Sequence, residues 1–79
     1  MTDIIRILIA DDFPLLREDL AELIGRQDDM VVAGEASTGG EIVALARETE
    51  YDLILMDIEM EQMNAGILAA ERIREEQPD

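Results

Sequence analysis

Residues 4–12 read IIRILIADD, a nearly continuous apolar run that stops at two adjacent carboxylates. The run contains four isoleucines and only one charged residue, Arg6, which is typical of a strand whose two faces are both buried. Asp11 and Asp12 end it, because aspartate is unfavourable inside strands and common in turns. The stretch therefore predicts a doubly buried strand that is followed at once by two carboxylates.

Two further extended segments share this character. Residues 30–36 read MVVAGEA, and residues 53–56 read LILM and break at Asp57 as the first run breaks at Asp11. Between these strands, and after the last of them, apolar residues recur at the spacing of one face of a helix. The expected helical faces are Leu16, Leu20, Leu23 and Ile24 after Pro14, then Ile42, Leu45 and Ala46, and last Ile67, Ala70 and Ile73, ending near Glu76.

The second helix carries its own start signal. Thr38 and Glu41 have the spacing of a capping box, in which a hydroxyl and a carboxylate each accept a hydrogen bond from a backbone N–H of the first turn. The element order is thus strand, helix, strand, helix, strand, helix, within one domain over residues 1–79. This alternation predicts an α/β fold, with a parallel sheet that has helices on both faces.

Three aspartates follow the first and third strands, and they would meet if these two strands are neighbours in the sheet. Asp11 and Asp12 follow the first strand and Asp57 follows the third, so all three are expected at the carboxyl edge of the sheet. Clustered carboxylates repel one another unless a cation compensates, and oxygen ligands without His or Cys suit Mg²⁺. Asp57 is then a candidate nucleophile. The alternative is that these are ordinary loop aspartates.

Composition excludes several classes of function. The net charge of −14 disfavours direct binding to nucleic acid or to anionic lipid surfaces. The chain has no cysteine, so disulfides and thiolate metal sites are ruled out and a reducing, cytoplasmic location is expected. The apolar run at residues 4–10 is far shorter than the roughly 20 residues that span a bilayer, so we expect no membrane segment.

Three stretches together carry a family resemblance. Residues 7–17 (ILIADDFPLLR), 30–37 (MVVAGEAS) and 51–58 (YDLILMDI) resemble the receiver domains of bacterial two-component response regulators, especially the NarL/FixJ subfamily of DNA-binding regulators. Asp12 and Asp57 also have the separation that the family pattern requires. Residues 59–66 (EMEQMNAG) depart from the family's usual Met-Pro-Gly-Met-Asp-Gly, so the resemblance does not extend to the geometry of that loop.

The resemblance implies a role for each acidic residue. Asp57 would take a phosphoryl group from a phosphohistidine on a sensor histidine kinase. Asp12 and Asp57 would hold Mg²⁺ directly, Asp11 would act largely through water, and the backbone carbonyl of Glu59 would supply another oxygen. The domain would assist its own phosphorylation as a switch in phosphorelay signalling, without being an enzyme that turns over a substrate.

The resemblance also implies a doubly wound parallel sheet of the flavodoxin-like type, with strand order 2-1-3. Residues 1–79 would be the N-terminal portion of such a receiver domain. The family's fourth and fifth strands, its last helices, the Ser/Thr and Lys that contact the phosphoryl group, and the DNA-binding output domain that controls transcription would lie beyond Asp79. We therefore expect the 79-residue chain to bind Mg²⁺ weakly and to be a poor phosphoacceptor. Its third strand would be an exposed edge, which predicts self-association or exchange of elements between copies.

Two other functional classes fit part of the pattern. A Mg²⁺-dependent α/β phosphohydrolase also uses an aspartate after a parallel strand, although such enzymes usually have a second aspartate where this chain has Glu59. A non-catalytic dimerisation fragment would need no chemistry at Asp57.

Overall fold

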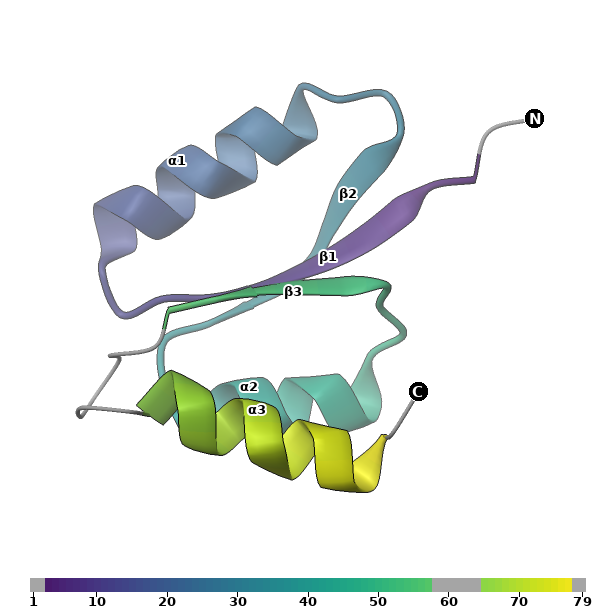
Figure 1. Cartoon of the computed structure of the whole chain (residues 1–79). Coiled ribbons are helices and arrows are strands. Elements are labelled where there is room, and N and C mark those ends of the chain that lie inside the picture. Colours follow the sequence, from purple (N-terminus) through teal and green to yellow (C-terminus); the bar gives the residue numbers. More distant parts are fainter. Residues whose placement is uncertain (1–2, 58–64, 78–79) are drawn as a thin grey trace.

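The computed structural model describes residues 3–57 and 65–77. Their elements alternate in the predicted order, with boundaries close to those expected from the sequence (Figure 1). The elements are β1 (Ile5–Ala10), α1 (Pro14–Gly25), β2 (Met30–Ala36), α2 (Gly39–Glu48), β3 (Leu53–Met56) and α3 (Ala65–Glu76).

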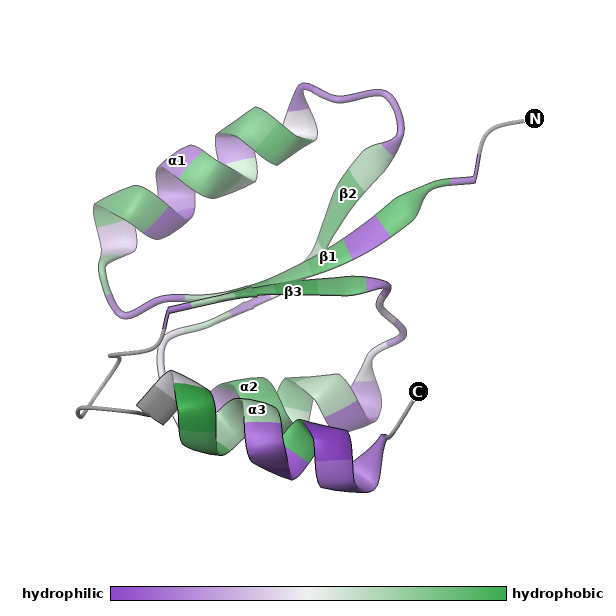
Figure 2. Ribbon diagram, in the orientation of Figure 1, coloured by the Kyte–Doolittle hydropathy of each residue, from purple (hydrophilic) through white to green (hydrophobic). Residues whose placement is uncertain are grey.

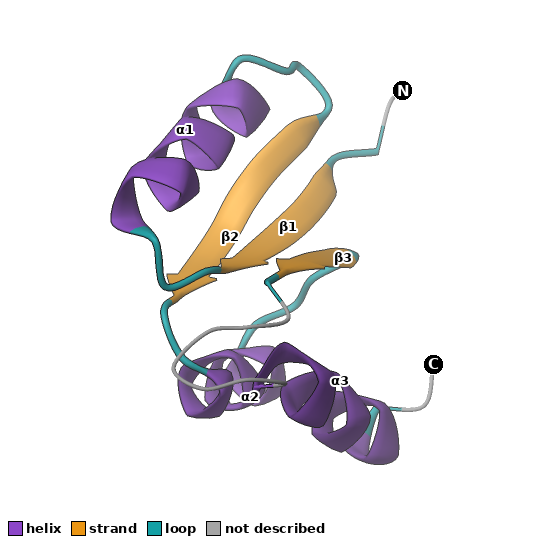
Figure 3. Ribbon diagram, turned by 60° about the vertical axis from the view of Figure 1, so that its left-hand side comes forward, coloured by secondary structure: helices purple, strands orange, loops and turns teal. Residues whose placement is uncertain are grey.

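The strands form one parallel sheet in the order β2-β1-β3, which confirms the predicted fold class and strand order (Figure 3). β1 lies in the centre, with Ile5 opposite Met30 of β2 and Ile7 opposite Leu53 of β3. The register with β2 shifts by one residue after Ile7. β3 is an edge strand among the described elements, and the side chain of Leu53 is 47% exposed.

Helices cover both faces of the sheet, with α1 on one side and α2 and α3 on the other (Figures 1 and 3). Because side chains alternate along a strand, β1 supplies both cores. Leu8 and Ala10 pack toward α2 and α3, whereas Ile7 and Ile9 pack toward α1. All four are nearly inaccessible to solvent, which confirms that this strand is buried on both faces.

The predicted apolar face of α3 is correct at Ile73 and wrong at Ile67 and Ala70. Gly66, Ala69 and Ile73 are buried, whereas Ile67 is 44% exposed and Ala70 is also exposed. Gly66 and Ala69 are small, which lets α3 approach α2 and the sheet closely, and Ile73 completes the buried stripe. Hydropathy does not distinguish Ala69 from Ala70, and the packing of α3 against α2 and the sheet decides which of them is buried. Figure 2 shows the hydrophilic residues gathered in the last turns of α3.

The predicted face of α1 is only partly correct. Ile24 is buried and Leu20 is half-buried against Ile7 and Ile9. The side chains of Leu16 and Leu23 are 43% and 54% exposed, because they flank the strip of α1 that meets the sheet.

Both residues of the predicted capping box of α2 form hydrogen bonds, but Glu41 binds one residue earlier in the chain than predicted. The Thr38 hydroxyl accepts a hydrogen bond from the Glu41 N–H (3.0 Å), as predicted. The Glu41 carboxylate accepts from the N–H and hydroxyl of Ser37 (2.8 and 2.7 Å), one residue before the N-cap, and these bonds lower the pKa of Glu41. α2 also lies close to β2, since a Cβ on Gly34 would be 2.8 Å from a methyl carbon of Leu45.

Charged side chains tie the loop before β3 to the start of β1. Asp52 Oδ2 accepts hydrogen bonds from the backbone N–H and the Nε of Arg6 (2.8 and 3.3 Å), and Glu50 accepts from Arg6 Nη1 (2.7 Å). The backbone N–H of Asp52 donates in return to the Arg6 carbonyl (2.7 Å). Arg6 therefore connects the amino ends of β1 and β3.

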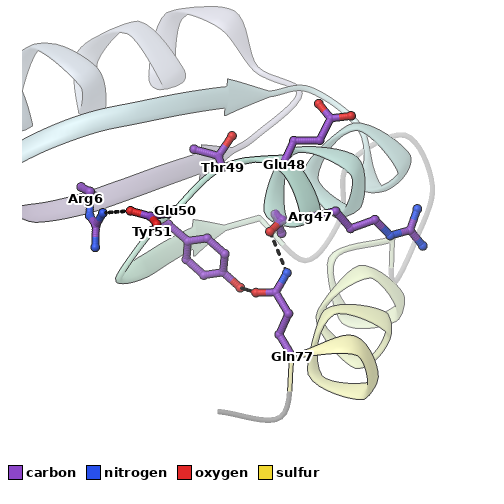
Figure 4. A pocket seen from close by; sticks show the side chains of 8 residues that line it. Arg6, Arg47, Glu48, Thr49, Glu50, Tyr51 and Gln77 are labelled. Carbon is purple, nitrogen blue, oxygen red and sulfur yellow. Dashed lines mark hydrogen bonds and ion pairs between the residues drawn. The ribbon is translucent and has the colours of Figure 1, made fainter.

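The end of α3 docks beside this loop, and residues from both segments line a pocket (Figure 4). Gln77 donates to the carbonyl of Ala46 (2.7 Å) and accepts from the Tyr51 hydroxyl (2.8 Å). Arg47 of α2 forms two hydrogen bonds with Glu76 of α3 (2.6 and 2.5 Å). These contacts hold α3 parallel to α2.

The Arg6–Asp52 contact predicts part of the acid sensitivity of the fold. The hydrogen bonds from the Arg6 backbone and guanidinium lower the pKa of Asp52. A carboxylate whose folded pKa is lowered stabilises the fold above its unfolded pKa, and this contribution is lost as the pH falls through the folded value. Asp52→Asn should therefore lower the free energy of unfolding at neutral pH, and the difference from wild type should vanish in acid.

Urea unfolding between about pH 3 and pH 7 measures this difference across the range in which carboxylates titrate. Asp19→Asn, which removes an exposed carboxylate of α1, is the control and should run parallel to wild type. A constant gap between Asp52→Asn and wild type at all pH values would contradict the prediction.

Candidate acidic site

The carboxyl ends of the strands are held together by backbone hydrogen bonds. The Asp57 N–H donates to the Ala10 carbonyl (2.8 Å), and the Asp11 N–H donates to the Ala36 carbonyl (3.0 Å). The residues that follow β1 and β3 are thereby brought to one edge of the sheet. This edge is the position at which open parallel sheets bind ligands.

The structure brings together the three aspartates singled out from the sequence. Asp11, Asp12 and Asp57 each offer a carboxylate oxygen, and these atoms all lie within 4.8 Å of one another. Asp11 is buried at 7% exposure, Asp57 is half-buried and Asp12 is exposed. The cluster is therefore buried at Asp11, next to the sheet, and accessible to solvent at Asp12.

The turn after β1 is built by the first aspartate. Asp11 Oδ1 accepts a hydrogen bond from the Phe13 N–H (2.9 Å), which closes a tight turn across Asp12. Phe13 is the N-cap of α1 but makes no capping hydrogen bond with its side chain, and Pro14 begins the helix. Proline suits this position because its φ angle is already helical and its missing N–H is not needed there.

The donor set fits a hard divalent cation. Carboxylate oxygens are the ligands that Mg²⁺ and Ca²⁺ prefer, and the sequence contains neither His nor Cys to favour a softer metal. Mg²⁺ is commonly held by one or two carboxylates together with waters and phosphate oxygens, which suits a cluster with one exposed side. Glu59, whose backbone carbonyl was expected to contribute, lies outside the described residues.

One charged neighbour of the site was not anticipated. The side chain of Arg17, in the first turns of α1, is only 22% exposed. Its Nη1 donates to the backbone carbonyl of Asp11 (2.6 Å), and its Nε lies 3.4 Å from Glu35 Oε1 of β2. The available signal was a lone basic residue in the first turns of the helix that directly follows an acidic pair.

Fold and site together define the class of protein. A parallel α/β sheet carries three convergent carboxylates where the chain order reverses, between β1 and β3. Residues 7–79 match the family described as "Response regulator receiver domain", and the chain belongs to this family. Receiver domains are signalling domains rather than classical enzymes, and they typically bind Mg²⁺ at an acidic pocket.

Several bacterial transcriptional regulators are similar to this chain. It is 47% identical over 77 residues to the uncharacterized transcriptional regulatory protein YxjL of Bacillus subtilis, covering 98% of this chain and 35% of that protein. It is 42% identical over 69 residues to the nitrate/nitrite response regulator protein NarL of Escherichia coli K12, covering 87% of this chain and 32% of NarL. The chain thus spans about a third of the length of these relatives.

Solved structures show the same arrangement of elements. A two-component response regulator of the LuxR family from Aurantimonas has a TM-score of 0.89 at 36% identity, covering 96% of this chain and 54% of that one. The response regulator domain of Thermotoga maritima CheB has a TM-score of 0.88 at 43% identity, covering 95% of this chain and 55% of that one.

None of the described helices is both long enough and apolar enough to cross a membrane.

Proposed function

We propose that this chain is the N-terminal part of the receiver domain of a cytoplasmic two-component response regulator. Asp57 accepts a phosphoryl group from a sensor histidine kinase, and the signal controls transcription through a DNA-binding output domain outside this chain. The observation that carries the proposal is the convergence of Asp11, Asp12 and Asp57 at the carboxyl edge of the sheet. The family match and the likeness to NarL support it.

In the proposed reaction, a carboxylate oxygen of Asp57 attacks the phosphorus of the phosphohistidine. A P–O bond forms as the P–N bond breaks, and the histidine ring leaves with the bonding electron pair and takes up a proton from solvent. Little covalent work is left to the protein, so position and charge decide the rate. The half-buried Asp57 at the end of β3 is held in place by the hydrogen bond from its N–H to Ala10.

Asp12 and Asp57 are proposed to hold Mg²⁺ directly, with Asp11 acting through water and the carbonyl of Glu59 adding an oxygen. When bound, the ion offsets the negative charge that would otherwise repel an incoming phosphoryl group. Three carboxylate oxygens within 4.8 Å of one another support this assignment. Asp11 is the most buried of the three and is committed to the Phe13 N–H, which suits an indirect role.

A protein partner at this edge is supported by exposed apolar side chains. Phe13, Leu15 and Leu16 are 56%, 63% and 43% exposed and lie in the turn and first helical turn directly after Asp12. Apolar surface beside a reactive site is typical of a protein contact. It suits a kinase that brings its phosphohistidine to Asp57.

The direct test is mass spectrometry after incubation with a small phosphodonor and Mg²⁺. The proposal expects one phosphoryl group per chain at most, located on Asp57 by fragmentation, and low occupancy in this 79-residue chain. Steady release of phosphate from a monoester would favour a phosphohydrolase instead. A label on any residue other than Asp57 would overturn the proposal.

The open edge of β3 is proposed to mediate self-association of this chain. Among the described elements β3 pairs only with β1, and an edge strand offers unpaired backbone groups to another chain. Leu53→Lys places a charge on this edge at a side chain that is already 47% exposed, so the core is spared. We expect concentration-dependent association of wild type in sedimentation at about 0.15 M salt, and weaker association of Leu53→Lys.

Leu23→Lys is the matched control, because Leu23 is 54% exposed on α1, away from that edge. Both variants reduce the net negative charge equally, so a general charge effect would strengthen association in each of them. A wild-type chain that stays monomeric at all concentrations would refute the edge proposal.

A further inference from the structure

Arg17 connects three elements behind the acidic site. It lies on α1, its Nη1 donates to the carbonyl of Asp11 at the end of β1 (2.6 Å), and its Nε faces Glu35 on β2 (3.4 Å). The Arg17 side chain is 22% exposed and that of Glu35 is 41% exposed, so the contact with the Asp11 carbonyl is the more shielded of the two. A guanidinium can serve both partners at once because its donors form a rigid fork.

The carbonyl that Arg17 holds belongs to the peptide that joins Asp11 to Asp12. A peptide unit is planar, so fixing its oxygen also fixes the direction of the Asp12 N–H and the position of the Asp12 Cα. Asp11 itself is anchored through its N–H to Ala36 (3.0 Å) and through Oδ1 to Phe13 (2.9 Å). Asp12 is exposed, and within the described residues no hydrogen bond holds its carboxylate.

Arg17 acts on the neutral carbonyl rather than on the carboxylates beside it. Among the described residues, its ion-pair partner within 4.0 Å is Glu35. The positive charge of Arg17 is therefore paired with Glu35, and the pairing does not use the carboxylate oxygens of Asp12 or Asp57. A basic side chain that turned toward those oxygens would compete with a metal ion for them.

We propose that Arg17 is a positioning residue, which sets the peptide between Asp11 and Asp12 and thereby orients the Asp12 carboxylate for a divalent cation. The inference rests on the proposed function for its metal and adds to it a residue that contacts neither the ion nor the phosphoryl group. Glu35 completes the arrangement by holding the guanidinium toward β2.

Substitutions at Arg17 separate this role from a general ion pair. Arg17→Met keeps the length of the side chain and removes every donor, while Arg17→Lys keeps the charge but has a single ammonium that cannot reach both partners. Arg26→Met is the matched control, because Arg26, the C-cap of the same helix, forms an exposed ion pair with Glu22. Circular dichroism establishes first that each variant is folded.

Isothermal titration with Mg²⁺ should give a dissociation constant raised roughly tenfold in Arg17→Met, the lower end of effects seen for residues that orient metal ligands. Arg17→Lys should weaken binding in the same direction, and Arg26→Met should bind as wild type. Equal affinities in wild type and in a folded Arg17→Lys would overturn the inference while leaving the proposed function standing. If Arg17→Met does not fold, Arg17→Lys alone decides.

A second measurement needs no metal. The backbone ¹⁵N shift of Asp12 reports the hydrogen bond to the preceding carbonyl, so it should move in metal-free Arg17→Lys and stay in place in Arg26→Met. An unchanged Asp12 signal in the Arg17 variants would contradict the positioning role. If wild type binds no Mg²⁺, the proposed function fails, and this signal still decides whether Arg17 sets the Asp12 peptide.

Discussion

Asp57→Asn is expected to abolish phosphorylation of the chain while leaving its fold intact. The substitution keeps the shape of the side chain and replaces the nucleophilic carboxylate oxygen with an amide. It also removes one negative charge from three carboxylates whose oxygens lie within 4.8 Å, so repulsion at the edge decreases. We expect the phosphoryl label to disappear from the mass spectrum and the urea midpoint to equal or exceed that of wild type in metal-free buffer.

Asp52→Asn is the matched control, since it makes the same chemical change at the other end of β3. Asp52 is paired with Arg6 at the amino edge of the sheet and has no contact with the acidic cluster. This variant should lose stability at neutral pH and keep its low level of phosphorylation. Comparing the two substitutions therefore separates an effect on phosphorylation from an effect on the stability of the fold.

Two results would contradict the assignment of Asp57. Undiminished labelling of Asp57→Asn would place the phosphoryl group on another residue. Unchanged association of Asp57→Asn, combined with no detectable labelling of wild type under any condition, would favour an interaction-only fragment.

Mg²⁺ is expected to raise the melting temperature of the chain. A ligand that binds only the folded state at about ten times its dissociation constant stabilises that state by about 1.4 kcal/mol. In a domain of this size 1 kcal/mol corresponds to about 4–8 °C, so the midpoint should rise by about 6–11 °C. The concentration that gives this rise should be high, because the 79-residue chain is expected to bind Mg²⁺ weakly.

Asp12→Asn should remove most of this rise, since it takes a proposed direct ligand from the exposed side of the cluster. Asp19→Asn, an exposed carboxylate of α1, should respond to Mg²⁺ as wild type does. NaCl at equal ionic strength controls for screening of the net charge of −14. A rise of the same size in NaCl, or in Asp12→Asn, would contradict a specific site.

The pattern of residues 4–12 was sufficient to predict a strand that is buried on both faces. A strand with apolar side chains on both faces needs both faces covered by other elements. The structure covers both faces of β1 with helices, and Ile7, Leu8, Ile9 and Ala10 are buried. The alternation of strands and helices then leaves few topologies, because parallel crossovers have one hand. The carboxylates after β1 and β3 meet only if these strands are neighbours, an order that the family resemblance implied and the structure confirms.

The choice of contact faces could not be predicted in this way. Ile67 and Ala70 have the hydropathy of a core stripe, yet α3 packs through Gly66, Ala69 and Ile73. The spacing of two helices depends on the volume of the side chains between them, and a single sequence pattern does not contain that distance.

The amino-acid sequence by itself determined the order of the elements, the doubly buried strand and the three aspartates at strand ends, because periodicity and turn chemistry act over a few neighbouring residues. Only the tertiary structure decided that Arg17 turns inward to the carbonyl of Asp11 and that α3 packs through Gly66 and Ala69. Such contacts depend on where separate elements come to rest, which is set by the packing of the whole chain rather than by any local segment.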